Sequence, residues 1–163
     1  MIQRVQSIFL FITSLAMFLV IFMPIWMETV PQGTMPGESN EYALLTALEL
    51  KYAKGGEEVE SQNTFYVALL AFLASAIAAG SLFSYKDRMR QIKLNLANTL
   101  VMAAVLIIIT FLLFDAEEAF MPDTQGQWRL GFFLTPLAML CNSVANRFIR
   151  KDEKMVRSAD RLR

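Results

Sequence analysis

The chain has 163 residues with no net charge, 55% of them apolar and only 18% charged, and its mean hydropathy is +0.42. Because a soluble domain carries about a quarter charged residues, this composition predicts a membrane protein. The sequence has no His, which excludes His-based zinc sites, bis-imidazole haem and any Ser-His or Cys-His nucleophile. Its one cysteine, Cys141, excludes an intramolecular disulfide and a C-x-x-C redox pair.

Four apolar runs follow one another along the chain, over residues 7–27, 64–85, 94–114 and 130–149. A helix rises about 1.5 Å per residue, so about 20 apolar residues cross the hydrocarbon core of a bilayer. Backbone groups in lipid must pair within their own segment, so the runs predict helices. We therefore expect an all-α membrane protein, a single domain over residues 1–163 built as a bundle of four transmembrane helices.

The first run follows Arg4 and resembles the start of a secretory signal peptide. It is longer than a usual signal core, and no small-x-small cleavage site follows it. We expect an uncleaved signal anchor. Pro24 near its end and Pro136 in the last run predict kinks, since proline removes a backbone hydrogen bond.

The loop over residues 28–63 is the one sizeable polar segment between the runs. It begins with turn formers, and residues 48–52 then alternate between apolar and polar side chains, which predicts a short strand or hairpin over the outer face of the bundle. The acidic residues 57–61 make a poor second strand, and a helix over Glu41–Tyr52 is the alternative. The acids of the loop 115–129 match no calcium-binding pattern and predict a solvated loop.

The charges separate strongly once the chain is divided at the four runs. Both ends and the loop 86–93 carry +8 together, and the loops 28–63 and 115–129 carry −8. Twelve of the fifteen Lys and Arg residues lie on the first side. The positive-inside rule then predicts that both termini and the loop 86–93 face the cytoplasm.

The tail over residues 150–163 mixes bases and acids, and its apolar residues recur near one helical face. Glu153 and Arg157 stand four residues apart, a spacing that supports a helix. We expect a cytoplasmic amphipathic tail that continues the fourth helix. Its expected partners are anionic lipid head groups, at about 1 kcal/mol per well-placed base, and a protein that contacts the tail.

The second run is rich in small residues. Ala71, Ser75 and Ala79 recur every four residues, and so do Ala76 and Gly80. Small faces let helices approach closely. They predict either a seam within the bundle, which we favour, or a surface for a protein partner.

Four amides occupy the cytoplasmic half of the predicted bundle: Asn95 and Asn98 open the third run, while Asn142 and Asn146 close the fourth. They predict either a polar pocket or interhelical hydrogen bonds. We favour the hydrogen bonds, because nothing titratable lies among the amides. The first three runs also contain no acid or base of the kind that marks ion routes.

The two ends of the chain resemble those of a known family. The start, Met1-Ile2-Gln3-Arg4, leads directly into an apolar run, and the end reads ANRFIRKDEK followed by MVRSADRLR over residues 145–163. This pattern resembles an uncharacterised family of small four-span inner-membrane proteins of unknown function from Bacteroidetes. The resemblance implies a bacterial inner membrane. It implies no reaction, substrate or site residue.

No catalytic, cofactor-binding or metal-binding residues are predicted, and the basic tail is too short and too mixed with acids for nucleic acid. The sequence therefore favours a non-enzymatic integral membrane protein, a structural or accessory subunit that binds a membrane complex or lipids. A small oligomeric transporter or channel that uses the amides is the alternative. An enzyme ranks third, since it would need Ser, acid or amide chemistry in the outer loops.

Overall fold

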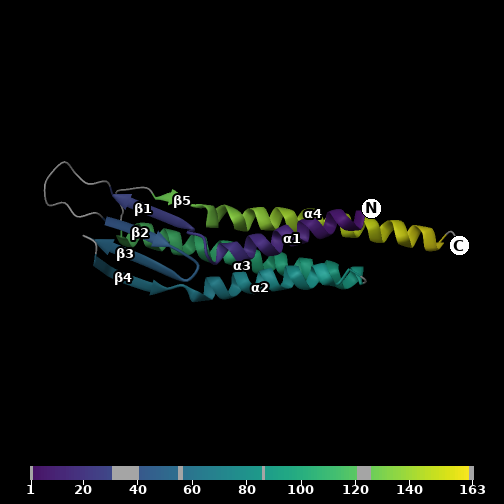
Figure 1. Cartoon of the computed structure of the whole chain (residues 1–163), viewed down its shortest axis with the longest axis horizontal. Helices are drawn as coiled ribbons and strands as arrows, with labels where there is room; N and C mark the ends of the chain where they lie inside the picture. The colour runs from purple at the N-terminus through teal and green to yellow at the C-terminus, as the bar shows by residue number, and fades with distance from the viewer. Residues whose placement is uncertain (1, 31–40, 55–56, 86, 121–125, 162–163) are drawn as a thin grey trace.

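The computed structural model describes residues 2–30, 41–54, 57–85, 87–120 and 126–161, which form four helices and a five-stranded sheet (Figure 1). The helices are α1 (Ile2–Val20), α2 (Phe65–Phe83), α3 (Arg88–Phe120) and α4 (Leu130–Arg161). The strands are β1 (Trp26–Val30), β2 (Glu41–Leu45), β3 (Glu49–Lys54), β4 (Glu57–Asn63) and β5 (Gln127–Trp128).

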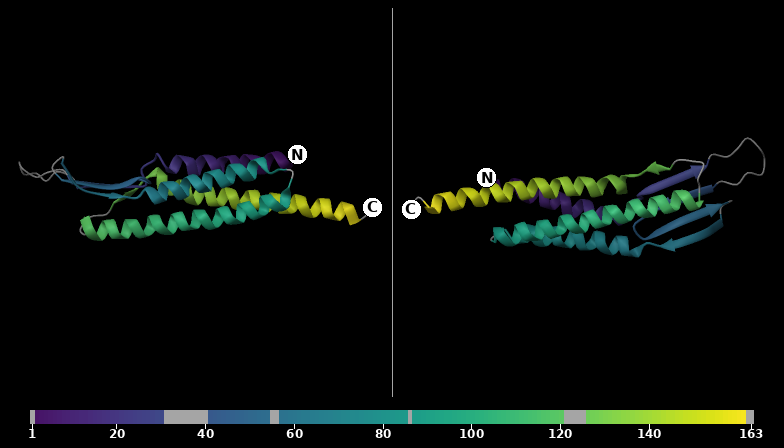
Figure 2. Two further views of the ribbon diagram at one scale, coloured as in Figure 1. Left: turned by 90° about the horizontal axis from the view of Figure 1, so that it is seen from below. Right: turned by 180° about the vertical axis from the view of Figure 1, so that it is seen from behind.

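The four helices pack side by side as a bundle. α1 contacts α2 and α4, and α3 contacts the same two helices, so α1 and α3 occupy opposite corners. The sheet lies at one end of the bundle, and both chain termini lie toward the other (Figures 1 and 2). We call these the sheet end and the basic end, the latter after the Lys and Arg residues at the start of α3 and along the end of α4, such as Arg90, Lys93, Arg147 and Arg150. At the basic end α4 extends past the other helices (Figure 2).

The sheet is antiparallel, with strand order β4-β3-β2-β1-β5. β2 is the central strand, between β3 and β1. The other side of β1 pairs with β5, where Trp26 lies opposite Trp128. Ala43, Leu45 and Leu50 are buried in the same core cluster as Leu112 and Leu113 of α3. α3 thus continues past the bundle to support the sheet.

The prediction of an all-α protein is therefore wrong. Pro24 disfavours helix for the residue before it and offers no N–H itself, and the chain leaves α1 after Val20 to enter β1. The alternative helix over Glu41–Tyr52 is also wrong, because this stretch forms β2 and β3. The acidic stretch that looked like a poor strand is β4, an edge strand with every side chain exposed, so its acids stay in water while its backbone pairs with β3.

Among the described residues, three helices are long and apolar enough to cross a membrane, over Phe65–Phe83, Arg88–Glu118 and Leu130–Val156. The apolar part of α1, Val5–Val20, is shorter. α3 has 33 residues and is about 50 Å long at 1.5 Å per residue, which exceeds the hydrocarbon thickness of about 30 Å. Length and composition of these helices indicate a membrane protein.

The distribution of side chains also suits lipid, because large apolar side chains cover the outside of all four helices. Among those more than half exposed are Ile8, Phe11, Leu69, Phe72, Leu100, Phe111, Phe133 and Leu140. Soluble monomers rarely expose apolar surface on this scale. Several polar side chains, including a number of amides, are buried between the helices instead.

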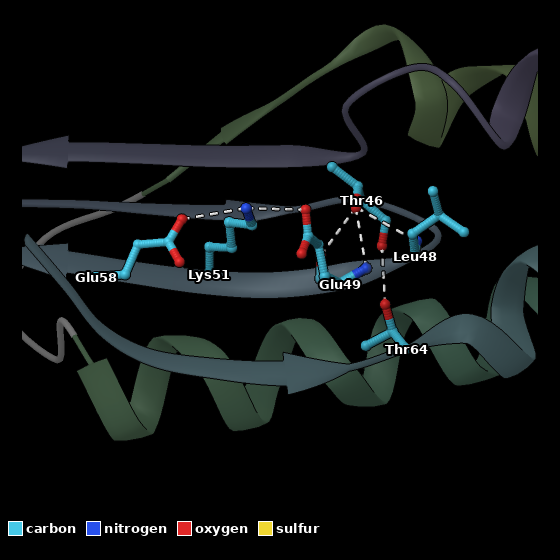
Figure 3. Close-up of polar contacts among 6 residues, drawn as sticks. All are labelled: Thr46, Leu48, Glu49, Lys51, Glu58 and Thr64. Atoms are coloured by element: carbon cyan, nitrogen blue, oxygen red, sulfur yellow. Dashed lines mark hydrogen bonds and ion pairs between the residues drawn. The ribbon is translucent and has the colours of Figure 1, made fainter.

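The β2–β3 turn joins the sheet to the bundle (Figure 3). The Thr46 hydroxyl closes the turn, accepting hydrogen bonds from the backbone N–H groups of Leu48 (3.3 Å) and Glu49 (3.1 Å). Carbonyl groups of the turn also accept hydrogen bonds from the start of α2. The N–H of Thr64 donates to Leu48 O (3.0 Å), and the N–H of Ala68 donates to Ala47 O (3.1 Å). The turn thus satisfies donors that a helix start leaves without partners.

A second junction links the end of the first apolar run to the start of α4. The N–H of Arg129 donates to Ile25 O (3.0 Å) and that of Gly131 donates to Pro24 O (2.9 Å). A Cβ on Gly131 would lie 2.7 Å from Pro24 O. Only glycine lets the two backbones approach this closely.

Candidate functional site: a buried amide cluster

Five amide side chains are buried at the basic end of the bundle, and we call them the amide cluster. They are Gln6 of α1, Gln91, Asn95 and Asn98 of α3, and Asn142 of α4. None is more than 1% exposed. The three on α3 are spaced four and three residues apart, which places them on one helix face.

Hydrogen bonds connect part of the cluster across three helices. The Asn142 amide donates to Asn95 O (2.8 Å) and to the Thr99 hydroxyl (2.9 Å), which joins α4 to α3. The Ser81 hydroxyl of α2 donates to Asn95 Oδ1 (2.6 Å), and Gln91 Nε2 donates to Ser81 O (3.0 Å). The predicted interhelical hydrogen bonds are present at Asn95 and Asn142.

Many amide atoms of the described residues nevertheless have no hydrogen-bond partner. They are the side-chain oxygens of Gln6, Gln91, Asn98, Asn142 and the adjoining Asn146, and the nitrogens of Asn95 and Asn98. Leaving a buried polar group without a partner costs about 1–3 kcal/mol, and native proteins contain few such groups. Asn98 is the extreme case, because neither end of its amide is bonded and its side chain is fully buried.

The bundle becomes apolar beyond the amide cluster. Toward the sheet end the buried side chains of α1 and α3 include Met17, Val20, Val105 and Ile109. Thr13, between the two regions, bonds to the backbone of its own helix at Phe9 O (2.9 Å). Within the described residues, the buried amides therefore lie in the basic-end half of the bundle, while the buried polar side chains toward the sheet end include Thr64 and Thr135.

The charged groups stand outside the amide cluster, at the start of α3 and along the extension of α4. Arg88 pairs with Asp152 (3.2 Å) and also donates to its backbone carbonyl (3.1 Å), so the two elements are tied together. Beside this pair lies a cleft of about 460 Å³, lined by Asp87, Arg88, Met89, Glu153 and Val156.

The structure divides the small residues of α2 between two faces. Ala71 and Ser75 are buried, and Ser75 Oγ donates to Ser14 O (2.9 Å) while Ser14 Oγ donates to Ser75 O (3.1 Å). This face is a seam between α1 and α2. Ala76 and Gly80 are exposed on the opposite face.

The remaining residues that the sequence singled out do not assemble into a site. Asp115, Glu117 and Glu118, expected in a loop, lie in the last turns of α3, and Asp123 is outside the described residues. Where the structure describes the chain, no three potential His, Cys, Asp or Glu ligands come together. Cys141 is buried beside Asn142.

Sequence reasoning missed two members of the amide cluster, Gln6 and Gln91. Both lie outside the apolar runs and look like ordinary polar residues at a membrane boundary. Gln91 stands four residues before Asn95, a spacing that places the two amides on one helix face and was available as a signal. Gln6 has no comparable signal in the sequence, because its burial follows from the packing of α1 in the bundle.

Two groups of linked ionisable residues lie in the described part of the sheet: Lys51 pairs with Glu49 and Glu58 (3.1 Å each), and the other group centres on Glu41. Lys54 forms an ion pair with Glu41, which lowers the pKa of Glu41 below its usual 4.5 and raises that of Lys54 above 10.5. Partial burial and a hydrogen bond to Glu41 (3.2 Å) raise the pKa of Tyr52. These contacts join β2 to β3 and hold no reactive group.

Comparison with known proteins gives a family but no activity. No curated protein matches the chain. A family model described as "Domain of unknown function (DUF4293)" matches residues 2–162, nearly the whole sequence. The chain therefore belongs to the DUF4293 family.

Proposed function

We propose that the protein is a non-enzymatic integral protein of a bacterial inner membrane, with four spans and both termini in the cytoplasm, and that it serves as a structural or accessory subunit of a membrane complex. The likeness of its two ends to small Bacteroidetes membrane proteins supports this location. α1 packs against two of the long apolar helices along the bundle, which supports its role as the fourth span.

The distribution of charge supports the orientation. The helix starts and extensions at the basic end carry Arg90, Lys93, Arg147, Arg150 and Lys151, and a surplus of Lys and Arg marks the cytoplasmic side. The acidic strand β4 and the last turns of α3 lie at the sheet end. The basic end then faces anionic head groups, which attract each nearby base by about 1 kcal/mol.

The extension of α4 is the observation that carries the accessory role. α4 is one helix from Leu130 to Arg161, so about 18 Å of it follows Ile149 at 1.5 Å per residue. Met155 and Val156 on this extension are 42% and 44% exposed. The Arg88–Asp152 pair anchors the base of the extension. An anchored charged helix with exposed apolar side chains is suited to docking against a partner protein.

Affinity purification in mild detergent, with mass spectrometry of the co-purifying proteins, tests this role. The double variant Met155→Ser/Val156→Ser keeps every charge and should lose a partner that the full-length chain retains. The matched control Lys151→Gln/Lys154→Gln keeps the apolar pair and should retain the partner while binding vesicles of anionic lipid more weakly. Retention of every partner by the Met155→Ser/Val156→Ser variant would refute the role.

A small oligomeric transporter or channel is the second candidate, and the unpartnered amide atoms favour it. The apolar packing around Met17, Val20 and Ile109 weighs against a route through a single bundle. Solute and ion flux in proteoliposomes tests it. Flux that is equal in the wild type, Asn98→Leu and Asn142→Leu would exclude a route through the amides.

A further inference from the structure

We propose that the amide cluster is a binding site for a small neutral molecule that both donates and accepts hydrogen bonds. The shared chemistry is that of water and of small hydroxyl or amide compounds. This inference goes beyond the accessory role and does not depend on it.

The unpartnered atoms define the chemistry of the occupant. Five side-chain oxygens and two nitrogens at this end of the bundle have no partner. The occupant must therefore supply several donors and also accept from Asn95 and Asn98. Both amide atoms of Asn98 are free, so rotating this amide by half a turn leaves the same requirement.

The surroundings favour a neutral occupant over an ion. No acid or base belongs to the amide cluster, and an isolated charge is costly to bury. The nearest charged groups on α3 and α4 include Arg88, Arg90, Lys93 and Arg147, with Asp152 paired to Arg88. This excess of bases disfavours a cation, while two free nitrogens are too few to replace the hydration of an anion.

The location excludes the alternative that lipid covers these groups. Gln6, Gln91, Asn95, Asn98 and Asn142 are each at least 99% buried inside the bundle. They come from three different helices, and α2 closes the group through Ser81. A molecule that bonds to them must therefore lie among the helices.

Two leucine variants of the purified full-length protein test the proposal, because the Leu side chain has the same branched four-heavy-atom shape as Asn and forms no hydrogen bonds. Asn142 donates to two partners in the structure, whereas Asn98 has none. If the amide cluster is occupied, both Asn98→Leu and Asn142→Leu lower the Tm, by about 3 °C or more for a chain of this size. If it is dry, Asn142→Leu lowers the Tm while Asn98→Leu raises it. That second result would overturn the proposal.

A labelling experiment keeps the proposal testable if Asn98→Leu does not fold. In a Cys141→Ala background, Asn98→Cys is compared with Val105→Cys, two fully buried positions seven residues apart on one face of α3. Methanethiosulfonate reagents need a thiolate, which forms only where water or another polar molecule solvates it. We expect at least tenfold faster reaction at position 98 in membrane vesicles of both orientations. Equal rates at the two positions would overturn the proposal.

The source of the occupant is then identified by mass spectrometry of small molecules released on denaturing the protein. A compound released by the wild type and absent from Asn98→Leu would assign a bound solute. Release of none, together with the expected Tm and labelling results, would assign water. An occupant found equally in both proteins would contradict binding at Asn98.

Discussion

Replacing Gly131 with alanine tests the junction between the first apolar run and α4. The new Cβ would lie 2.7 Å from Pro24 O and 2.8 Å from Met23 O, both backbone atoms. Ordinary carbon–oxygen contacts begin near 3.4 Å, so one backbone must move by about 0.7 Å to relieve the contact with Pro24 O. Overpacking of this kind costs about 1–3 kcal/mol.

The movement would also strain the hydrogen bonds that start α4. Gly131 N–H donates to Pro24 O at 2.9 Å and Arg129 N–H donates to Ile25 O at 3.0 Å. Each such bond contributes about 1 kcal/mol net. We therefore expect Gly131→Ala to destabilise the protein by about 2–4 kcal/mol, which corresponds to roughly 4–16 °C in Tm for a chain of this size.

Gly80→Ala is the matched control. A Cβ on Gly80 meets nothing within 4 Å, and the residue lies inside α2. Alanine in an exposed helix position is favoured over glycine by about 0.5–1 kcal/mol, so this variant should raise the Tm slightly. The buried Cys141 thiol reports unfolding directly, through reaction with a fluorogenic maleimide during heating at one scan rate. Equal Tm values for the two variants would refute the close approach at Gly131.

Three further predictions concern single contacts. Thr64→Val removes the hydrogen bond from the Thr64 hydroxyl to Thr46 O (3.2 Å) and should lower the free energy of unfolding by about 1 kcal/mol. The control Thr110→Val should change the Tm little, because the Thr110 hydroxyl bonds within its own helix to Leu106 O (2.8 Å). Similar losses of stability in both variants would contradict the role of the β2–β3 turn. Ser75→Ala removes the hydrogen bond to Ser14 O (2.9 Å) and should lower the free energy of unfolding by about 0.6–1 kcal/mol. Thermal unfolding measures this loss, with Ala76→Ser on the exposed face as the control. An unchanged Tm for Ser75→Ala would argue against the α1–α2 seam. The Glu41–Lys54 pair should stabilise the sheet fully between about pH 5 and pH 10, because its contribution is lost as the pH falls through the lowered pKa of Glu41 or rises through the raised pKa of Lys54. The Tm difference between wild type and Glu41→Gln should therefore shrink below pH 4. A constant difference down to pH 2 would contradict the pairing.

The helices were predictable because their signal is contained in each segment. An uninterrupted apolar run predicts a helix without reference to the rest of the chain. α2 at Phe65–Phe83, for example, lies within the run 64–85. The sheet has no such local signal. Trp26 and Met27 belong to an apolar run. They become part of a strand only by pairing with other segments, β2 on one side and β5, about a hundred residues away, on the other.

β4 shows the same limit in another form. Its acids disfavour a strand by composition, but an edge strand needs only one paired neighbour and can expose all its side chains. The amide cluster was half predictable, since Asn95, Asn98 and Asn142 stand out within apolar runs. Gln6 and Gln91 lie in polar flanks, and only the packing of the helices shows that they are buried.

The pairing of β1 with β5 has a consequence for the order in which the molecule assembles. β1 to β4 come from residues 26–63 and can pair as soon as that segment has been synthesised. β5 arrives only after α2 and α3, so closing this contact requires a loop of about a hundred residues and belongs to the slow, late steps of folding. α4 begins two residues after β5, and in its first turn the N–H of Gly131 donates to Pro24 O. Completion of the sheet and docking of the last helix therefore form one cooperative event, and a chain arrested before residue 127 would hold both structures unfinished.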